Sequence, residues 1–250
     1  TLGGNGTHKT ANLLSQEGMN IIGLPKTIDN DIWGTDVTFG FHTAVDIGTE
    51  VVDRIHTTAS SHKRVMVIEI MGNKAGWLTL YTGIAGGADI ILIPEIPYDI
   101  KKVIKAVERR ANDGKSFSII AVAEGAFDTA EAKMKKKERS ERRAAAGETT
   151  ATNRIARQIA EATGFDTRVV VPGHYLRGGS PSSYDRVLAS QFGVYAAELV
   201  SKKIFGVAVA EQNNRVMHNS LADVAGKTKF VTPDDQMVFT ARSLGISFGD

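Results

Sequence analysis

The first residues of the chain that could carry out chemistry are Gly3-Gly4-Asn5-Gly6-Thr7. Glycines let the backbone approach an anion closely, so amide N–H groups and the N-terminus of a following helix can bind phosphate. Thr7 and Lys9 add a hydroxyl group and a positive charge. The same residues also suit a tight strand-to-helix turn without a ligand, and similar loops occur in more than one protein family. Both interpretations stay open for this segment alone.

A second segment, Thr27-Ile28-Asp29-Asn30-Asp31, follows a strand predicted over residues 20–24. Open α/β sheets place their ligands at the carboxyl ends of strands. Two carboxylates one residue apart can divide the work, one accepting the proton of a hydroxyl group and the other lying near a metal ion. Asp and Asn also favour simple Asx-turns. The neighbouring glycine segment and Gly34-Thr35-Asp36 favour the functional interpretation.

A third segment, residues 173–181, carries His174 and Arg177 among glycines and again follows a predicted strand. The planar guanidinium group of arginine can donate two hydrogen bonds to one phosphate. Arg177 is therefore a candidate phosphate ligand, although a lone arginine in a loop is usually only a surface residue.

Helical and extended patterns alternate along the chain, which predicts an α/β fold with mostly parallel strands. Strands are expected over residues 65–70, 90–93, 116–123, 168–171 and 207–210. Helices are expected over residues 9–16, 77–85, 100–111 and 184–205, and along an apolar face between residues 41 and 55. Thr232-Pro233-Asp234-Asp235 predicts the cap and first turn of a closing helix.

Composition excludes several classes of protein. The net charge of +2 argues against a polyanionic partner, so neither nucleic acid nor a membrane surface is expected. The absence of cysteine excludes disulfides and thiolate metal sites. No apolar stretch approaches the roughly 18 residues of a membrane span. The basic segment 128–148 lacks interleaved aromatic residues, so we expect a mobile, solvated insertion there without chemistry.

Five motifs in this order resemble those of the phosphofructokinase family. The family patterns are Gly-Gly-Asp-(Gly/Asp)-(Ser/Thr), Pro-(Gly/Lys)-Thr-Ile-Asp-Asn-Asp, Ser-Ser-His-x-Arg, Met-Gly-Arg and Gly-His-x-x-Arg-Gly-Gly-x-Pro. The corresponding residues here are 3–7, 25–31, 60–64, 71–73 and 173–181, and the similarity continues to residues 241–246. Five ordered motifs indicate membership of that family.

The resemblance implies two α/β domains, each a parallel sheet between helical layers. Residues 1–40 and 177–226 would form the remainder of a nucleotide-binding domain, and residues 41–176 and 227–250 a sugar-phosphate-binding domain. Because the chain opens as if in the last turn of a strand, we expect a fragment that lacks the family's N-terminal nucleotide-binding units. The family is usually a homotetramer with active sites shared between subunits, so a cytoplasmic, allosteric homo-oligomer is expected.

The implied reaction is ATP-dependent phosphorylation of fructose 6-phosphate at C1 in glycolysis. Asp29 would be the catalytic base with Thr27 beside it, and Asn5 and Asp31 would lie at the cofactor Mg²⁺. The donor phosphates would be bound by Gly4, Asn5, Gly6, Thr7, Lys9 and Lys26. The sugar phosphate would be bound by Thr27, Asp29, Met71, Gly72, Glu124, His174 and Arg177, with Arg64 and Arg168 supplied by a neighbouring subunit.

Several positions depart from the family pattern. Asn5 replaces the usual Asp, Asn73 replaces a common Arg, and Thr10 replaces a Gly. Gly6 leaves room for the α-phosphate of ATP, whereas Lys26 is typical of pyrophosphate-dependent members. We predict ATP as the donor because a steric block discriminates more strongly than an extra charge. The alternatives are a pyrophosphate-dependent enzyme and a catalytically silent fragment or regulatory subunit.

Overall fold

The computed structural model describes residues 1–250, which fold into two compact units. Unit 1 comprises Thr1–Ala44 and Gly179–Phe230, and unit 2 comprises Val45–Gly178 and Val231–Asp250. These boundaries lie within four residues of those expected from the sequence. The predicted α/β architecture with mostly parallel strands is confirmed. No helix is both long enough and apolar enough to cross a membrane.

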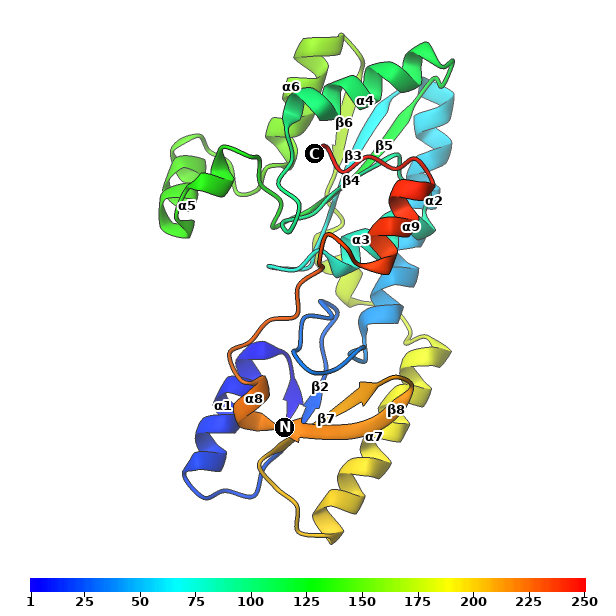
Figure 1. Cartoon of the computed structure of the whole chain (residues 1–250). Helices are drawn as coiled ribbons and strands as arrows, with labels where there is room; N and C mark the ends of the chain where they lie inside the picture. The colour runs from blue at the N-terminus through cyan, green and yellow to red at the C-terminus, as the bar shows by residue number, and fades with distance from the viewer. The chain divides into compact units, whose positions relative to one another are not determined.

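Unit 1 contains a four-stranded sheet in the order β1-β2-β7-β8. Its strands are β1 (Leu2–Gly3), β2 (Ile22–Pro25), β7 (Val207–Gln212) and β8 (Arg215–Ser220), of which only β8 runs antiparallel. Helices α1 (Asn5–Gln16) and α8 (Leu221–Val224) cover one face, and α7 (Ser183–Ser201) covers the other (Figure 1). The sequence did not predict β8, because this edge strand is only partly buried and has no apolar run.

Unit 2 contains a four-stranded, wholly parallel sheet in the order β4-β5-β3-β6. The strands are β3 (Val65–Ile70), β4 (Ile90–Leu92), β5 (Ser118–Ala123) and β6 (Thr167–Val170). The helices are α2 (Phe41–His62), which begins in unit 1, α3 (Trp77–Ala85), α4 (Ile100–Asn112), α6 (Thr152–Thr163) and α9 (Gln236–Ser243). The short 3₁₀ helix η2 (Gly173–Arg177) follows β6.

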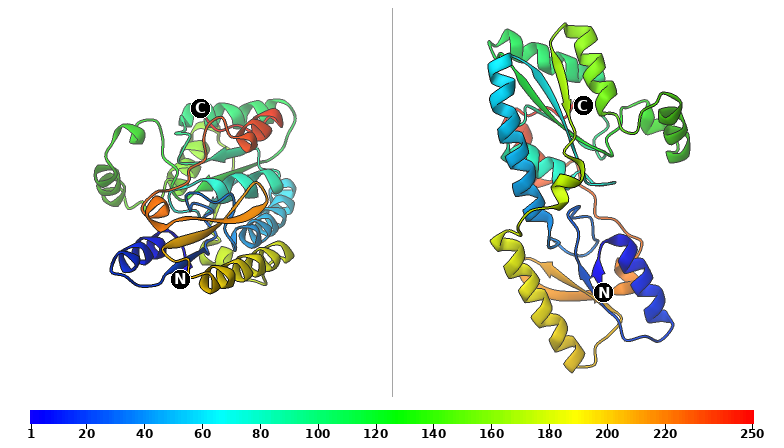
Figure 2. Two further views of the ribbon diagram at one scale, coloured as in Figure 1. Left: turned by 60° about the horizontal axis from the view of Figure 1, so that its bottom comes forward. Right: turned by 180° about the vertical axis from the view of Figure 1, so that it is seen from behind.

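The core of unit 2 lies between its sheet and two helices. Val103 and Val107 of α4 and Ile155 and Ile159 of α6 are almost fully buried against β3, β4 and β5. Figure 2 shows α4 and α6 on one side of this sheet and α2 and α3 on the other. Each apolar helix face meets a strand of near-continuous apolar residues, which is typical of a parallel sheet covered on both sides.

Three predicted helix ends were wrong. Helix α1 begins at Asn5 rather than at residue 9, so the second half of the glycine segment forms its first turn. Helix α7 ends at Ser201, and Lys203 then adopts a left-handed φ of 56° that a helix cannot continue through. Helix α9 is capped by Asp235, whose side chain accepts a hydrogen bond from the Met237 amide, and not by Thr232.

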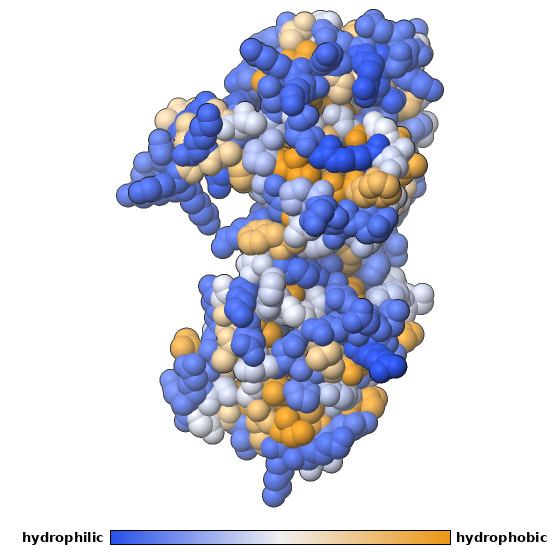
Figure 3. All heavy atoms as spheres, in the orientation of Figure 1, coloured by the Kyte–Doolittle hydropathy of each residue, from blue (hydrophilic) through white to orange (hydrophobic).

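The basic segment is more ordered than the sequence predicted. It contains the 3₁₀ helix η1 (Glu131–Lys133) and helix α5 (Lys136–Ala145), which projects from unit 2 and has a hydrophilic surface (Figures 1 and 3). Glu131 is fully buried and accepts hydrogen bonds of 2.8 Å from the guanidinium groups of Arg143 and Arg154. Most of the segment is exposed, as expected for a solvated insertion, but the sequence did not predict the buried ion cluster that anchors it.

Replacing Glu131 is expected to destabilise unit 2. Burial by itself raises the pKa of this carboxyl group, but hydrogen bonds from Arg143 and Arg154 outweigh it and lower the pKa to about 2. Glu131→Gln leaves the buried guanidinium group of Arg143 without a counter-ion and Arg154 with only Glu148 and Asp128, which costs roughly 3 kcal/mol of unfolding free energy. Denaturant unfolding at pH 7 measures this loss, and Glu138→Gln, an exposed position on α5, is the control.

The same cluster predicts how stability depends on pH. Because the pKa of Glu131 is lower in the folded than in the unfolded chain, its contribution is complete above an unfolded pKa of about 4.5. That contribution disappears as the pH falls from there toward 2. The difference between wild type and Glu131→Gln should therefore shrink over this range, and a difference that stays constant down to pH 2 contradicts the assignment.

Candidate active-site residues in the two units

The glycine segment of unit 1 lies at the junction of β1 and α1. Gly4 is the helix N-cap and has an extended backbone, so the first amide groups of α1 are available to an anion. A Cβ atom at Gly3 would lie 2.1 Å from Oγ1 of Thr7, so only glycine fits there. By contrast, a Cβ atom at Gly6 would have no atom within 4 Å, which leaves open space beside the segment. Lys9 is exposed on α1.

The acidic segment lies beside the glycine segment because β1 and β2 are parallel neighbours. Gly3 pairs with Pro25, and the amide of Lys26 donates to the carbonyl oxygen of Gly3 over 3.1 Å. Thr27 lies close to Gly4, since a Cβ atom on that glycine would be 3.7 Å from Cβ of Thr27. The structure thus brings together the segment predicted to bind the donor phosphates and the segment predicted to carry the base and a metal ligand.

A side-chain contact joins the two segments directly. The Asn5 amide nitrogen donates to a carboxylate oxygen of Asp31 over 2.7 Å and to the Asp31 carbonyl oxygen over 3.2 Å. Asp31 is 5% exposed. The amide oxygen of Asn5 is buried without a hydrogen-bond partner, which is costly unless a ligand or cation occupies it.

The turn between Thr27 and Asp31 is held from several sides. The Asp29 amide donates to Oγ1 of Thr27 over 3.2 Å, which makes a Ser/Thr-type turn rather than an Asx-turn. Asn30 is buried with a left-handed φ of 51°, and its side-chain oxygen accepts from the Thr38 amide and from Nζ of Lys229. The sequence analysis missed Lys229, because nothing along the chain indicates its return to this turn.

The fit of Mg²⁺ can be judged from these donors. Magnesium prefers hard oxygen ligands and usually keeps waters and substrate phosphate oxygens beside one or two protein groups. Asp31 supplies a carboxylate, and the unpartnered oxygen of Asn5 supplies an amide ligand. The chain contains no group of three or more His, Cys, Asp or Glu side chains that could hold a metal by themselves. The residues fit a magnesium ion that is shared with a phosphate.

Unit 2 places another set of predicted residues at one edge of its sheet. Met71 and Gly72 follow β3, Glu124 follows β5, and η2 with His174 and Arg177 follows β6. These three strands are adjacent and parallel, so their carboxyl ends share an edge. His174 and Arg177 are exposed, whereas Leu176 is buried and fixes η2 to the unit. The salt bridges within the chain do not include Arg177, so its guanidinium group can pair with a ligand.

Glu124 has a contact that the sequence did not predict. One of its carboxylate oxygens accepts hydrogen bonds from the Gly72 amide over 3.1 Å and from the Asn73 amide over 2.6 Å. The predicted substrate ligand therefore also holds the backbone of the segment after β3.

Arg64 and Arg168 lie at the opposite end of the same strands. Arg64 precedes β3, and Arg168 pairs with Met66 near the start of β3. Both bind Asp166, through contacts of 2.6 Å and 2.9 Å, and the Arg64 contact contributes most to lowering the pKa of Asp166. β3 has six residues and is about 20 Å long, so these arginines do not meet Met71 or His174 within unit 2. The sequence analysis missed Asp166, whose role depends on this strand pairing.

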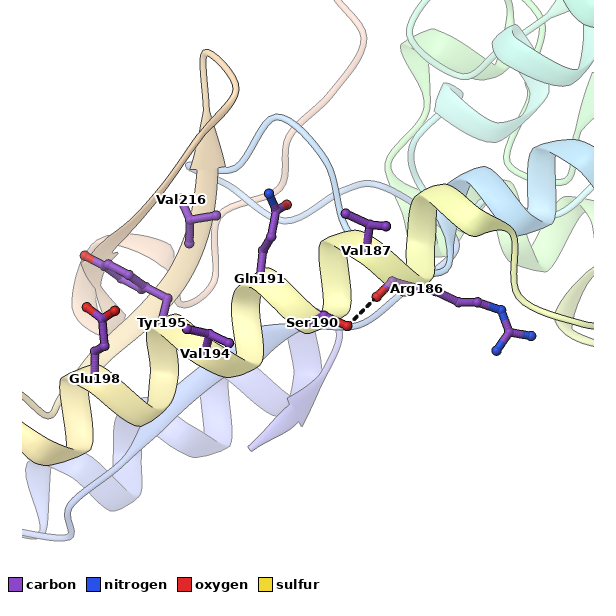
Figure 4. Close-up of a pocket in the computed structure, with 8 residues that line it drawn as sticks. All are labelled: Arg186, Val187, Ser190, Gln191, Val194, Tyr195, Glu198 and Val216. Atoms are coloured by element: carbon purple, nitrogen blue, oxygen red, sulfur yellow. Dashed lines mark hydrogen bonds between the residues drawn. The ribbon is translucent and has the colours of Figure 1, made fainter.

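An apolar groove of unit 1 contains none of these residues. It lies along α7 and β8, has a volume of about 560 Å³ and includes Val187, Val194 and Val216 (Figure 4). We assign no chemistry to it, because none of the predicted site residues lines it.

Comparison with known proteins places these features in context. The family model for phosphofructokinase matches residues 1–200. An ATP-dependent 6-phosphofructokinase from Spirochaeta thermophila is 58% identical over 249 residues, covering 100% of this chain and 68% of that protein. ATP-dependent 6-phosphofructokinase 3 from Bacteroides thetaiotaomicron is 47% identical, covering 99% of this chain and 69% of the relative.

Solved structures show the same fold. The phosphofructokinase of Saccharomyces cerevisiae matches with a TM-score of 0.77 at 31% identity, covering 89% of this chain and 32% of that one. A pyrophosphate-dependent phosphofructokinase from Nitrosospira multiformis matches with a TM-score of 0.79 at 22% identity, covering 94% of this chain and 62% of that one.

Proposed function

Because this chain belongs to the phosphofructokinase family, we propose that it carries out the ATP-dependent phosphorylation of fructose 6-phosphate at C1. The observation that carries the proposal is the contact of Asn5 with Asp31, which joins a phosphate-binding helix N-terminus to a pair of carboxylates. Such a site works by positioning the reactants and by neutralising charge on the transferred phosphoryl group. The products are fructose 1,6-bisphosphate and ADP, as in glycolysis.

In the proposed reaction, the C1 hydroxyl oxygen of fructose 6-phosphate forms a bond to the γ-phosphorus of ATP, and Asp29 accepts the proton of that hydroxyl group. The bond between that phosphorus and the β–γ bridging oxygen breaks, and ADP leaves. Thr27 orients the Asp29 backbone through its hydroxyl group. The amides at Gly4, Asn5, Gly6 and Thr7, with Lys9 and Lys26, would bind the donor phosphates.

Asn5 and Asp31 would hold Mg²⁺ together with the donor phosphates. When bound, the ion would neutralise charge on the phosphate oxygens. The unpartnered amide oxygen of Asn5 supports this assignment.

Unit 1 would be the nucleotide-binding domain and unit 2 the sugar-phosphate-binding domain. Met71, Gly72, Glu124, His174 and Arg177 would bind the sugar phosphate. Arg64 and Arg168 would act on the site of a neighbouring subunit, a role supported by their place at the far end of β3 and β6. We accordingly propose a homo-oligomer with shared active sites, a homotetramer on the family resemblance. Regulation by allosteric effectors and a cytoplasmic location are proposed on that resemblance as well.

Binding of fructose 6-phosphate tests the substrate half of this proposal. Arg177→Ala removes a guanidinium group that can donate two hydrogen bonds to one phosphate. Calorimetry should therefore show the affinity for fructose 6-phosphate falling at least about thirtyfold. Arg186→Ala, an exposed arginine on α7 bound only to Ser180 and Pro181, is the matched control. Unchanged affinity in Arg177→Ala, or no binding by the folded wild type at millimolar ligand, contradicts the proposal.

Asn5→Asp tests the metal half. The substitution places a second carboxylate within about 3 Å of Asp31, where repulsion costs on the order of 1–2 kcal/mol without a cation. The variant should melt roughly 3 °C lower than wild type in EDTA and gain more thermal stability from millimolar Mg²⁺. Asn20→Asp adds the same charge at an exposed position of unit 1 and should show neither effect. If Mg²⁺ does not change the melting temperature of Asn5→Asp, the assignment of the metal ligands is wrong.

A further inference from the structure

The segment after β3 (the 72–76 loop, Gly72-Asn73-Lys74-Ala75-Gly76) turns sharply through two residues with positive φ. Gly72 has a φ of 151° and Asn73 a left-handed φ of 54°. Glycine adopts a positive φ without strain and asparagine is enriched in the left-handed region, so these residue types suit the turn. Within the loop, the Ala75 amide donates to the Gly72 carbonyl oxygen over 3.0 Å. Other amides of the loop donate to side chains from elsewhere in unit 2.

Two glutamates provide the hold, one at each end. Glu124 accepts hydrogen bonds from the Gly72 and Asn73 amides. Glu95, in the segment after β4, accepts from the Gly76 amide with both carboxylate oxygens, over 2.9 Å and 3.1 Å. No sequence motif indicates Glu95. We propose that Glu95 is a positioning residue for sugar-phosphate binding, acting through the 72–76 loop, an inference that rests on the proposed function.

The contact with Glu95 lies at the end of the loop, where helix α3 begins. Gly76 is the N-cap of α3, where backbone amides have no partner within the helix. Because Gly76 has no side chain, it cannot cap these amides itself. The Glu95 carboxylate accepts from the amide of the N-cap residue itself, the donor that a glutamate at the third helical position takes in a capping box. It also accepts from the Val231 amide over 3.1 Å, so one group joins the loop, the start of α3 and the C-terminal segment of unit 2.

Close packing fixes the same geometry. A Cβ atom at Gly76 would lie 2.5 Å from Cβ of Ile93 and 2.7 Å from a carboxylate oxygen of Glu95. A Cβ atom at Gly125 would lie 2.3 Å from the Asn73 carbonyl oxygen. The loop thus packs directly on the ends of β4 and β5. If Glu95 withdrew, the Gly76 amide would be left without an acceptor and the loop could shift.

The contacts of Glu95 indicate whether its length, its acceptor oxygens or its charge is needed to hold the 72–76 loop. Burial raises its pKa, and the groups that oppose this are backbone amides rather than cations. A single oxygen accepts from both Gly76 and Val231, and the amide oxygen of a glutamine can occupy that place. The positioning role therefore requires reach and an acceptor, and a negative charge is not needed.

A pair of substitutions separates reach from charge. Glu95→Asp keeps the charge but is one methylene shorter, by about 1.5 Å, and loses the two amides. Glu95→Gln keeps the reach and loses the charge. By calorimetry, the dissociation constant for fructose 6-phosphate should rise at least about tenfold in Glu95→Asp and stay within about threefold in Glu95→Gln. Affinity for ATP should be unchanged in both, and Glu108→Asp and Glu108→Gln, at an exposed position of α4, are the controls.

Amide hydrogen exchange supplies a readout that needs no ligand. The Gly76 and Val231 amides should exchange at least about tenfold faster in Glu95→Asp and at the wild-type rate in Glu95→Gln. Wild-type affinity in Glu95→Asp, or a loss in Glu95→Gln as large as in Glu95→Asp, overturns the inference. If wild type binds no fructose 6-phosphate, the proposed function fails, and the exchange rates still decide whether Glu95 positions the loop. If Glu95→Asp does not fold, Glu95→Gln decides between acceptor and charge.

Discussion

Asp29→Asn is expected to lower turnover at least about a hundredfold and to leave the affinity for fructose 6-phosphate nearly unchanged. The side chain keeps its shape but can no longer accept the proton of the C1 hydroxyl group. The backbone should not move, because the Asp29 amide is held by Oγ1 of Thr27 and the buried Asn30 fixes the following turn. The loss should therefore appear in kcat rather than in the dissociation constant of the sugar phosphate.

Steady-state kinetics together with calorimetry check this prediction. Asp223→Asn removes an exposed carboxylate from α8 in the same unit and serves as the control for the change in charge. If Asp29→Asn retains near-normal turnover, another group accepts the proton and the assignment of the base is wrong.

Gly6→Asp is expected to lower the use of ATP by roughly a hundredfold with little effect on folding. The structure has no atom within 4 Å of a Cβ atom at this position, so the fold can accept the side chain. Gly6 also lies in the first turn of α1, where an acidic residue favours a helix. The cost therefore arises against the ligand, because a carboxylate at this position takes up space beside the α-phosphate of ATP and repels its negative charge.

Two further variants show whether bulk or charge is responsible. Gly6→Ala adds a methyl group to open space and should retain most ATP-dependent activity. Lys26→Gly should reduce activity far less than Gly6→Asp, because the Lys26 backbone already pairs with Gly3 through an interaction that glycine preserves. Assays of all four proteins with ATP and with pyrophosphate give the comparison. Faster turnover of the unmutated protein with pyrophosphate than with ATP would show that Lys26 outweighs Gly6.

Local patterns in the sequence determined the type of fold. The apolar runs of β3 and α3 matched the observed elements at both ends, because β3 buries five of its six residues and α3 six of its nine. The alternation of such runs with amphipathic helices predicted parallel sheets, since parallel strands need helical crossovers. The helix ends were predicted less well. Asp235 caps α9 although Thr232 and Pro233 offered the stronger local signal, because packing decides which turn begins the helix.

The glycine and acidic segments could be recognised from the sequence, and the ligand roles of the site residues stay predictions that follow from the family resemblance. Residue type and order along the chain are sufficient for that, because the backbone of a phosphate loop and the carboxylates of a base are local features.

Only the tertiary structure decided which groups hold these residues in place. Asp31 meets Asn5 because β1 and β2 are neighbours, Arg64 shares Asp166 with Arg168 because β3 pairs with β6, and Glu95 reaches Gly76 from the end of β4. Glu131 lies in a segment whose sequence resembles a solvated loop, and burial against two arginines makes it an anchor. A carboxylate has the same local signature whether it faces water or caps a distant amide. Its role follows from the strand order and loop packing that bring its partner to it.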